Sequence, residues 1–191
     1  MNQKEHKKIL IITHQLSRTG APIVLLDMMR AYRRHGYQLE VITMMDGELC
    51  RDIEEMGVPL TVQEHFLQQS EAFFAYAGGF DLVVANTLVT FEAVHLLKYL
   101  KVPVLWWLHE GRQYFELFAN VLPDFRTLPS NIHVLSVGHY VQEVIEDLYG
   151  VHTEILHFGV ADSPSGNVRQ REEQKVRFLT AGTYSRVNAQ D

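Results

Sequence analysis

The sequence predicts a doubly wound α/β domain on a mostly parallel sheet of about seven strands. Short apolar runs alternate regularly with amphipathic segments along the chain, which is the pattern of parallel strands joined by crossover helices. The first run is continuous and rich in β-branched residues, as in a strand that is buried on both faces. Glycines follow several amphipathic segments, where helices commonly end. These three observations favour a Rossmann-like architecture with helices on both faces of the sheet.

The first strand and helix show the pattern most clearly. Lys8–Thr13 (KILIIT) predicts a strand, and Ala21–His35 carries apolar residues at spacings of three and four, which place them on one helical face. Pro22 suits the first turn, where its missing N–H costs nothing, and Gly36 suits the position just after the helix.

The same unit then repeats. Further strands are predicted at Gln38–Met44, Val58–Val62, Asp81–Ala85, Val102–Leu108, Ile132–Val137 and His152–Phe158. The helices between them are predicted at Glu48–Met56, Phe66–Ala77, Thr90–Leu100, Arg112–Asn120 and His139–Tyr149.

A change in composition predicts a domain boundary. Residues 1–160 are expected to form one domain, and the polar stretch 161–175 (ADSPSGNVRQREEQK) reads as an exposed linker. One more apolar run, Val176–Ala181, follows it and predicts that residues 176–191 begin a second, truncated domain.

Composition narrows the function classes. The chain has 191 residues and a formal net charge of −6, so no overall basic field favours nucleic acid. Its single cysteine, Cys50, cannot form an internal disulfide, which suggests a cytoplasmic setting. The N-terminus lacks the features of a signal peptide, and no apolar run approaches the ~18 residues of a membrane span.

Candidate binding residues follow the predicted strands, because ligands of open parallel sheets bind beyond the carboxyl ends of the strands. Small residues before the first helix can bring backbone N–H groups to an anion. His109-Glu110 follows a strand with two tryptophans and is the strongest candidate for binding or proton transfer, since an apolar wall perturbs pKa values. The candidates for substrate or phosphate binding are Thr19, Gly20, Ala21, Asn86, Thr87, Ser136, His139 and Gly159.

Each candidate also has a purely structural interpretation, which stays open. Thr19-Gly20-Ala21 can be a tight turn, and Asn86-Thr87 a turn and helix start. His14 and His139 are more often exposed loop histidines than ligand contacts. His109-Glu110 can cap the next helix. Trp106 and Trp107 are expected in the core rather than in a stacking platform for bases.

Several chemistries are excluded by missing motifs. The sequence has no G-x-G-x-x-G after its first strand, no G-x-x-x-x-G-K-[ST] and no G-x-S-x-G. Its ten histidines are dispersed without ligand spacing, and Cys50 has no thiol partner, so no metal site is expected. The interpretation that remains is a domain that binds an anionic or polyhydroxylated ligand.

Five segments, in order, resemble retaining GT-B glycosyltransferases of family 4. Thr19-Gly20-Ala21-Pro22 resembles that family's small-residue loop, Gly36–Val41 its second strand, and Val104–Glu110 its "WWIHE" segment. His133–Glu143 is similar to a "vvsvSe" segment. Ile155–Asp162 is similar to "vipnGvD", which crosses into the donor domain.

The resemblance implies the acceptor-side, N-terminal half of an enzyme that transfers a sugar from a nucleotide-sugar donor with retention, without a metal or other cofactor. It implies that His109 contacts the transferring sugar or the acceptor and that Glu110 orients it. Gly20 and Ala21 would present N–H groups to phosphate or let the acceptor approach. Asn86, Thr87, Ser136 and His139 would line the acceptor cleft. Residues 1–191 alone are expected to be inactive, because half of the cleft belongs to the second domain.

Two alternatives stay open. Where the family usually has Lys and Arg in the donor domain, this chain has Asn188 and Thr183. These departures favour a non-catalytic glycosyltransferase-like binding or regulatory subunit.

The basic cluster Arg30, Arg33, Arg34 and His35 suits either a weak peripheral membrane contact or, more simply, a solvated helix end.

Overall fold

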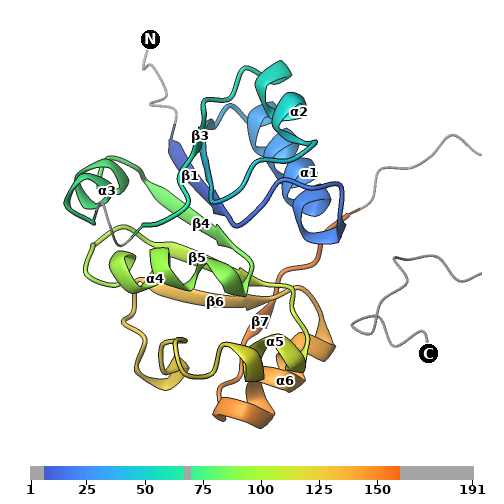
Figure 1. Ribbon diagram of the computed structural model, residues 1–191, viewed down its shortest axis with the longest axis vertical. Coiled ribbons are helices and arrows are strands. Elements are labelled where there is room, and N and C mark those ends of the chain that lie inside the picture. Colours follow the sequence, from blue (N-terminus) through green and yellow to red (C-terminus); the bar gives the residue numbers. More distant parts are fainter. Residues whose placement is uncertain (1–6, 67–69, 160–191) are drawn as a thin grey trace, which may run out of the picture. The chain divides into compact units, whose positions relative to one another are not determined.

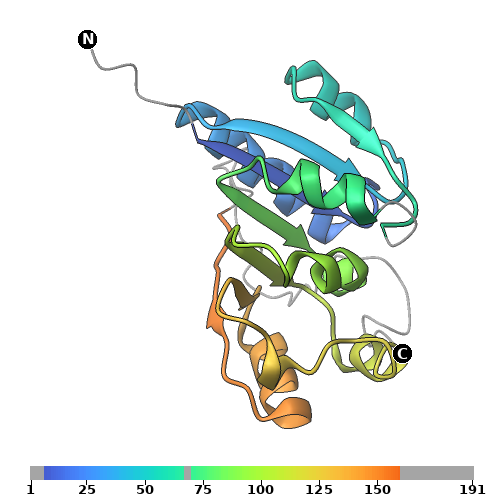
Figure 2. The same ribbon diagram turned by 90° about the vertical axis from the view of Figure 1, so that its left-hand side faces the viewer.

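The computed structural model describes residues 7–66 and 70–159. Within them, seven strands form one sheet in the order β3-β2-β1-β4-β5-β6-β7, which Figure 2 shows from teal β3 at the top to orange β7 at the bottom. The strands are β1 (Lys8–Thr13), β2 (Gln38–Thr43), β3 (Leu60–Val62), β4 (Leu82–Asn86), β5 (Val104–Leu108), β6 (Ile132–Ser136) and β7 (Glu154–Ile155). All six neighbouring pairs are parallel. The predicted doubly wound, Rossmann-like sheet is confirmed.

Helices connect the strands (Figure 1). They are α1 (Gly20–Arg34), α2 (Cys50–Glu55), α3 (Ser70–Ala77), α4 (Phe91–Leu97), α5 (Arg112–Leu117) and α6 (His139–Tyr149), with the short 3-10 helices η2 (Leu88–Thr90) and η3 (Phe125–Thr127). No helix of the described ranges is both long and apolar enough to cross a membrane.

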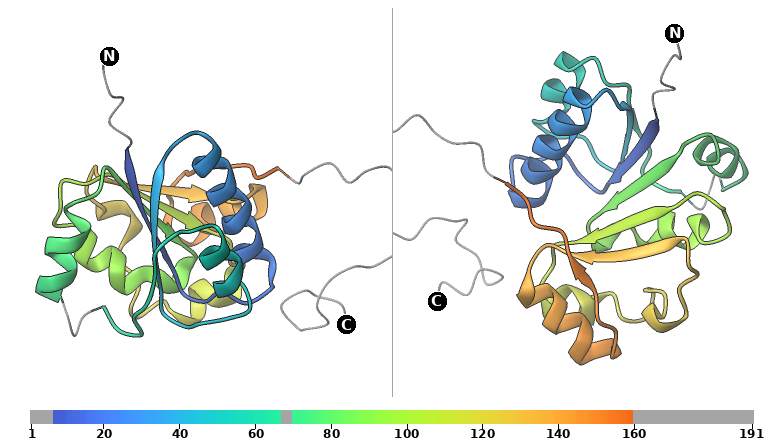
Figure 3. Two further views of the ribbon diagram at one scale, coloured as in Figure 1. Left: turned by 90° about the horizontal axis from the view of Figure 1, so that it is seen from above. Right: turned by 180° about the vertical axis from the view of Figure 1, so that it is seen from behind.

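Two apolar layers cover the two faces of the sheet. Leu25 and Met29 of α1 and Ile53 of α2 pack with Ile9 and Ile11 of β1 on one face. Helices α3, α4, α5 and α6 pack on the other face against residues such as Leu10, Val83 and Trp106. Seen from behind in Figure 3, α1 and α2 lie at one end of the row of strands and α5 and α6 at the other. The helices divide between the two faces because right-handed crossovers run outward in two opposite directions from the centre of the sheet.

Several element boundaries differ from those predicted. β7 pairs with β6 only over Glu154–Ile155, because an edge strand has one neighbour and needs no long ladder. Helix α5 ends at Leu117 rather than at Asn120, and α4 begins after η2 and ends at Leu97. The predicted linker 161–175 and second domain 176–191, with Thr183 and Asn188, lie outside the described residues.

Candidate functional site

The carboxyl ends of β1, β4 and β5 lie side by side at one edge of the sheet. The register pairs Thr13 of β1 with Asn86 of β4, and Asn86 with Trp107 of β5. From β1 the chain proceeds outward to β2 and β3, and it then returns to β4 on the other side of β1. The strand order therefore reverses between β1 and β4. This position is the topological switch point, and open α/β sheets bind their ligands there.

Thr87 joins these strand ends. It is fully buried and its φ is +82°, which is unfavourable for a β-branched residue. Its N–H donates to the Trp107 carbonyl at 2.8 Å. Its own carbonyl accepts the Trp106 Nε1–H at 3.0 Å and the Thr90 hydroxyl at 2.8 Å. These bonds hold the backbone in the strained conformation.

The Thr87 side chain reaches the first loop. Its Oγ1 forms a hydrogen bond with Nδ1 of His14 at 2.9 Å. Burial lowers the pKa of His14 below 6.5, so the imidazole is neutral at neutral pH. The sequence favoured an exposed loop position for His14, but the structure places it half-buried at the switch point. The signal that identifies it is its position directly after a strand that pairs with β4.

Glu110 connects the end of β5 to η2. One carboxylate oxygen accepts the backbone N–H of Leu88 at 2.9 Å and that of His109 at 3.0 Å. Burial raises the pKa of Glu110, and these backbone N–H donors oppose the rise. The side chain does not cap the next helix, because α5 begins after Gly111 without a side-chain cap. It instead stabilises the segment that follows Thr87.

His109 packs against Trp107, with the ring centroids 4.5 Å apart. Burial lowers its pKa to about 4, so the ring is neutral at neutral pH. Its Nε2 is buried without a hydrogen-bond partner in the described part of the chain. A neutral imidazole in this state can donate to or accept from a polar ligand.

The loop before α1 carries Thr19, Gly20 and Ala21. Thr19 precedes the helix, and its hydroxyl bonds to that of Ser17 at 2.9 Å rather than to the helix. Gly20 and Ala21 are the first residues of α1, where N–H groups have no acceptor in a preceding turn. Gly20 is exposed, so this end of the helix is open to an anion.

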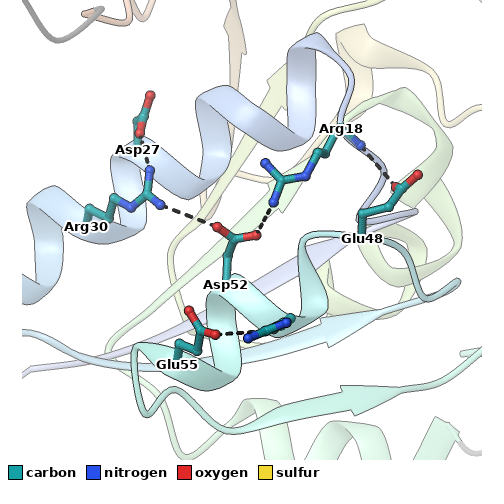
Figure 4. A network of polar contacts seen from close by, with 7 residues as sticks. Arg18, Asp27, Arg30, Glu48, Asp52 and Glu55 are labelled. Carbon is teal, nitrogen blue, oxygen red and sulfur yellow. Dashed lines mark hydrogen bonds and ion pairs between the residues drawn. The ribbon is translucent and has the colours of Figure 1, made fainter.

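Ion pairs tie this loop to α2, as Figure 4 shows. The Arg18 guanidinium lies 2.8 Å from the Asp52 carboxylate, and the Arg18 N–H donates to Glu48 at 3.3 Å. Gly47 is required nearby, because a Cβ at this position would lie 2.4 Å from the Leu16 carbonyl. These contacts could not be read from the sequence, because they join residues about 30 positions apart.

The other predicted residues lie apart from this cluster. Ser136 is fully buried, and its hydroxyl is 2.6 Å from that of Thr153. His139 is exposed at the first position of α6, and Gly159 is exposed after β7. The structure thus links Thr87 to Trp106 and Trp107 of β5, and Glu110 to Leu88. No described contact joins Ser136, His139 or Gly159 to these residues.

Two cavities lie elsewhere, and no predicted site residue lines them. One, of about 210 Å³, lies where β1 and β2 begin and includes Lys8 and Gln38. The other, of about 300 Å³, lies between the sheet and α3 and includes Ile42 and Tyr76. Among the described residues, no three His, Cys, Asp or Glu side chains are grouped to hold a metal ion. We place the candidate site at the switch point because polar groups of His14, Thr87, His109 and Glu110 lie at the strand ends there.

A family model provides the deciding comparison. The model of glycosyl-transferase family 4 matches residues 5–162, which include all seven strands. The chain belongs to glycosyl-transferase family 4. Comparison with curated protein sequences gives no significant match to this family 4 chain.

Two solved structures of Anabaena HepE (Alr3699) share the fold. The structure in complex with UDP and glucose is 20% identical, with a TM-score of 0.61, over 81% of this chain and 45% of HepE. The structure in complex with UDP-glucose is 19% identical, with a TM-score of 0.60, over 81% of this chain and 44% of HepE. This family 4 chain therefore spans less than half of HepE.

Proposed function

We propose that this chain is the N-terminal, acceptor-side half of a glycosyltransferase that moves a sugar from a nucleotide-sugar donor with retention. Family membership supports sugar transfer. The HepE structures of the same fold, in complexes with UDP and glucose and with UDP-glucose, support a nucleotide-sugar donor.

The observation that carries the proposal is the linked set of strand ends at the switch point. His109 is neutral and half-buried beside Trp107, which suits a hydrogen bond to a hydroxyl of the sugar or the acceptor. Glu110 and Thr87 fix the backbone around it. We propose that His109 contacts the substrate and that Glu110 is a positioning residue.

The start of α1 suits the charged part of the donor. Helix N-termini stabilise phosphate, and preorganised N–H donors stabilise the charge that develops on a leaving diphosphate. We propose that Gly20 and Ala21 supply such donors without a metal ion. We propose that the remaining donor contacts belong to the second domain, which the sequence predicts to begin at residue 176. We also propose a cytoplasmic setting, since Cys50 is a free thiol.

The test measures sugar binding by residues 1–191 with saturation-transfer NMR, using glucose and UDP-glucose as probes. We expect both probes to give signals that weaken in His109→Ala and persist in His133→Ala, because His133 is exposed on β6. Equal weakening in both variants, or no signal from the wild-type chain, would contradict the proposed site. Transfer of sugar by residues 1–191 alone would contradict the proposed need for a second domain.

Asn188 and Thr183 favour a second candidate, a non-catalytic subunit that binds sugars and pairs with an active partner. The same binding measurements on a protein that carries both domains separate the two. Sugar binding without turnover supports the subunit, whereas release of the nucleotide together with glycosylated acceptor supports the transferase.

A further inference from the structure

Three buried polar atoms at the ends of β4 and β5 have no hydrogen-bond partner among the described residues. They are Oδ1 of Asn86, Nε1 of Trp107 and Nε2 of His109. Asn86 and Trp107 are 0% and 1% exposed. Protein interiors rarely leave such groups unpaired, and each one requires an explanation.

The three residues are neighbours. Asn86 and Trp107 are directly paired in the β4–β5 ladder, so their side chains leave the same face of the sheet. The Trp107 and His109 rings are in contact at 4.5 Å between centroids. The three residues therefore form one cluster, on the face of the sheet that Val84 and Leu105 share with α1 and α2.

The neighbouring hydrogen bonds fix the orientation of the Asn86 amide. The Thr13 hydroxyl donates to the Gln15 carbonyl at 3.3 Å, so it has no hydrogen left for Asn86 and can only accept from it. The Asn86 Nδ2 group donates to Thr13 at 3.4 Å. Its Oδ1 is consequently left as an acceptor without a donor.

The chemistry of the cluster selects one kind of ligand group. Asn86 offers an acceptor, Trp107 a donor, and the neutral His109 ring either one. A phosphate oxygen can accept from Trp107 but has no hydrogen for Asn86, whereas an ammonium group can serve Asn86 but not Trp107. A hydroxyl group both donates and accepts, so it is the kind of group that can pair with either atom.

We propose that Asn86, Trp107 and His109 form a subsite for a sugar hydroxyl, with Trp107 as a binding residue. This inference rests on the proposed function and adds to it, because it assigns the cluster to the sugar rather than to the diphosphate. The contrast with Trp106 supports it. Trp106 already donates its Nε1–H to the Thr87 carbonyl and stacks on Phe125, so it has no donor left for a ligand.

The experiment follows the two indole N–H signals of ¹⁵N-labelled residues 1–191, since the chain has two tryptophans. Trp106→Phe and Trp107→Phe assign the signals. The probes are glucose, UDP-glucose and inorganic diphosphate. We expect the Trp107 signal to move with glucose and UDP-glucose and to stay in place with diphosphate, while the Trp106 signal stays in place throughout.

Trp107→Phe tests the same inference by affinity. It retains an aromatic ring but removes the unpaired donor, so we expect glucose to bind about threefold to tenfold more weakly. Without ligand, Trp107→Phe should lose less unfolding free energy than Trp106→Phe, because Trp106→Phe breaks an existing hydrogen bond. Unchanged glucose affinity in Trp107→Phe would overturn the proposal.

The remaining outcomes separate this inference from the proposed function. If glucose moves the backbone signals of His109 and Glu110 but not the Trp107 indole, sugar binding stands and the subsite is wrong. The same holds if the indole exchanges magnetisation only with water, because a buried water also satisfies such groups. If no probe moves any signal, both proposals fail.

Discussion

Thr87 illustrates how a single residue can carry the geometry of this site. A positive φ at a β-branched residue costs on the order of 1–3 kcal/mol, yet here all polar atoms of Thr87 have partners from other segments. Its N–H and carbonyl bind the two tryptophans of β5, and its hydroxyl binds His14. The strain is therefore offset by contacts that also orient His14 and the start of η2.

The two backbone hydrogen bonds that Glu110 accepts give the first prediction. Glu110→Ala leaves the N–H groups of Leu88 and His109 without an acceptor, so we expect a loss of about 2–4 kcal/mol of unfolding free energy. Glu110→Gln keeps an acceptor oxygen and should lose less than about 1 kcal/mol. Urea unfolding at neutral pH measures both, with the exposed Glu116→Ala as a control. Equal losses for Ala and Gln would show that the hydrogen bonds contribute nothing.

The half-buried His109 ring predicts a pH dependence of stability. Its pKa of about 4 in the folded chain lies below the ordinary 6.5, so the unfolded chain binds the proton first as pH falls. Stability should therefore decrease from pH 6.5 to 4, by at most about 3 kcal/mol, and level off below that range. Comparing wild type with His109→Gln at each pH isolates this effect. A difference that stays constant across the range would contradict it.

Residue-level roles were only partly predictable from the sequence. The sequence identified His109-Glu110 and Asn86-Thr87 as candidates from their positions after strands. It did not show the bond from Glu110 to Leu88, which joins residues 22 positions apart. That bond depends on the left-handed backbone of Thr87, and a β-branched residue gives no local signal for such a conformation.

At the scale of elements, a network of ion pairs fixes the β1–α1 loop. Asp52 of α2 lies 2.8 Å from Arg18 in that loop and 3.7 Å from Arg30 of α1, and Arg30 also pairs with Asp27 (Figure 4). One carboxylate thus connects three segments. Arg30, one member of the basic cluster, is thus engaged in ion pairs with two acidic residues.

This network predicts that Asp52 stabilises the domain more than an ordinary surface acid. Asp52→Asn removes the charge that faces two arginines, so we expect a loss of about 1 kcal/mol at low ionic strength and less at about 0.5 M salt. Glu55→Gln is the matched control, because its pair with Arg51 is exposed on the same helix. It should change stability by less than about 0.5 kcal/mol. Losses of equal size, or a loss insensitive to salt, would contradict the network.

Element positions were predictable where the apolar pattern is continuous. The strand Lys8–Thr13 and the helix His139–Tyr149 have the predicted boundaries, since a buried strand and a strongly amphipathic helix carry clear periodic signals. The edge strand Glu154–Ile155 is much shorter than predicted. The backbone N–H and C=O groups beside an edge strand can bond to water instead of to β6, so the sequence does not fix where pairing stops.

At the scale of the whole molecule, the strand order places the site. The reversal between β1 and β4 brings together loops that are more than 70 residues apart, as the His14–Thr87 bond shows. The sequence predicted parallel strands but not their order, because each strand has the same apolar character. The order emerges only when the helices divide between the two faces of the sheet.

This topology predicts that the sheet domain folds without the last segment of the chain. Residues 1–158 form one compact unit and contain all seven strands, so a chain shortened to these residues should unfold in one cooperative transition. Its unfolding temperature should lie within a few degrees of that of residues 1–191, as measured by circular dichroism. A second shortened chain, ending at Gly150, removes β7 and the Thr153 partner of Ser136. It should be clearly less stable, because Ser136 would lose its buried hydrogen bond and β6 would become an open edge. If the first shortened chain failed to fold, the core would depend on residues beyond Phe158.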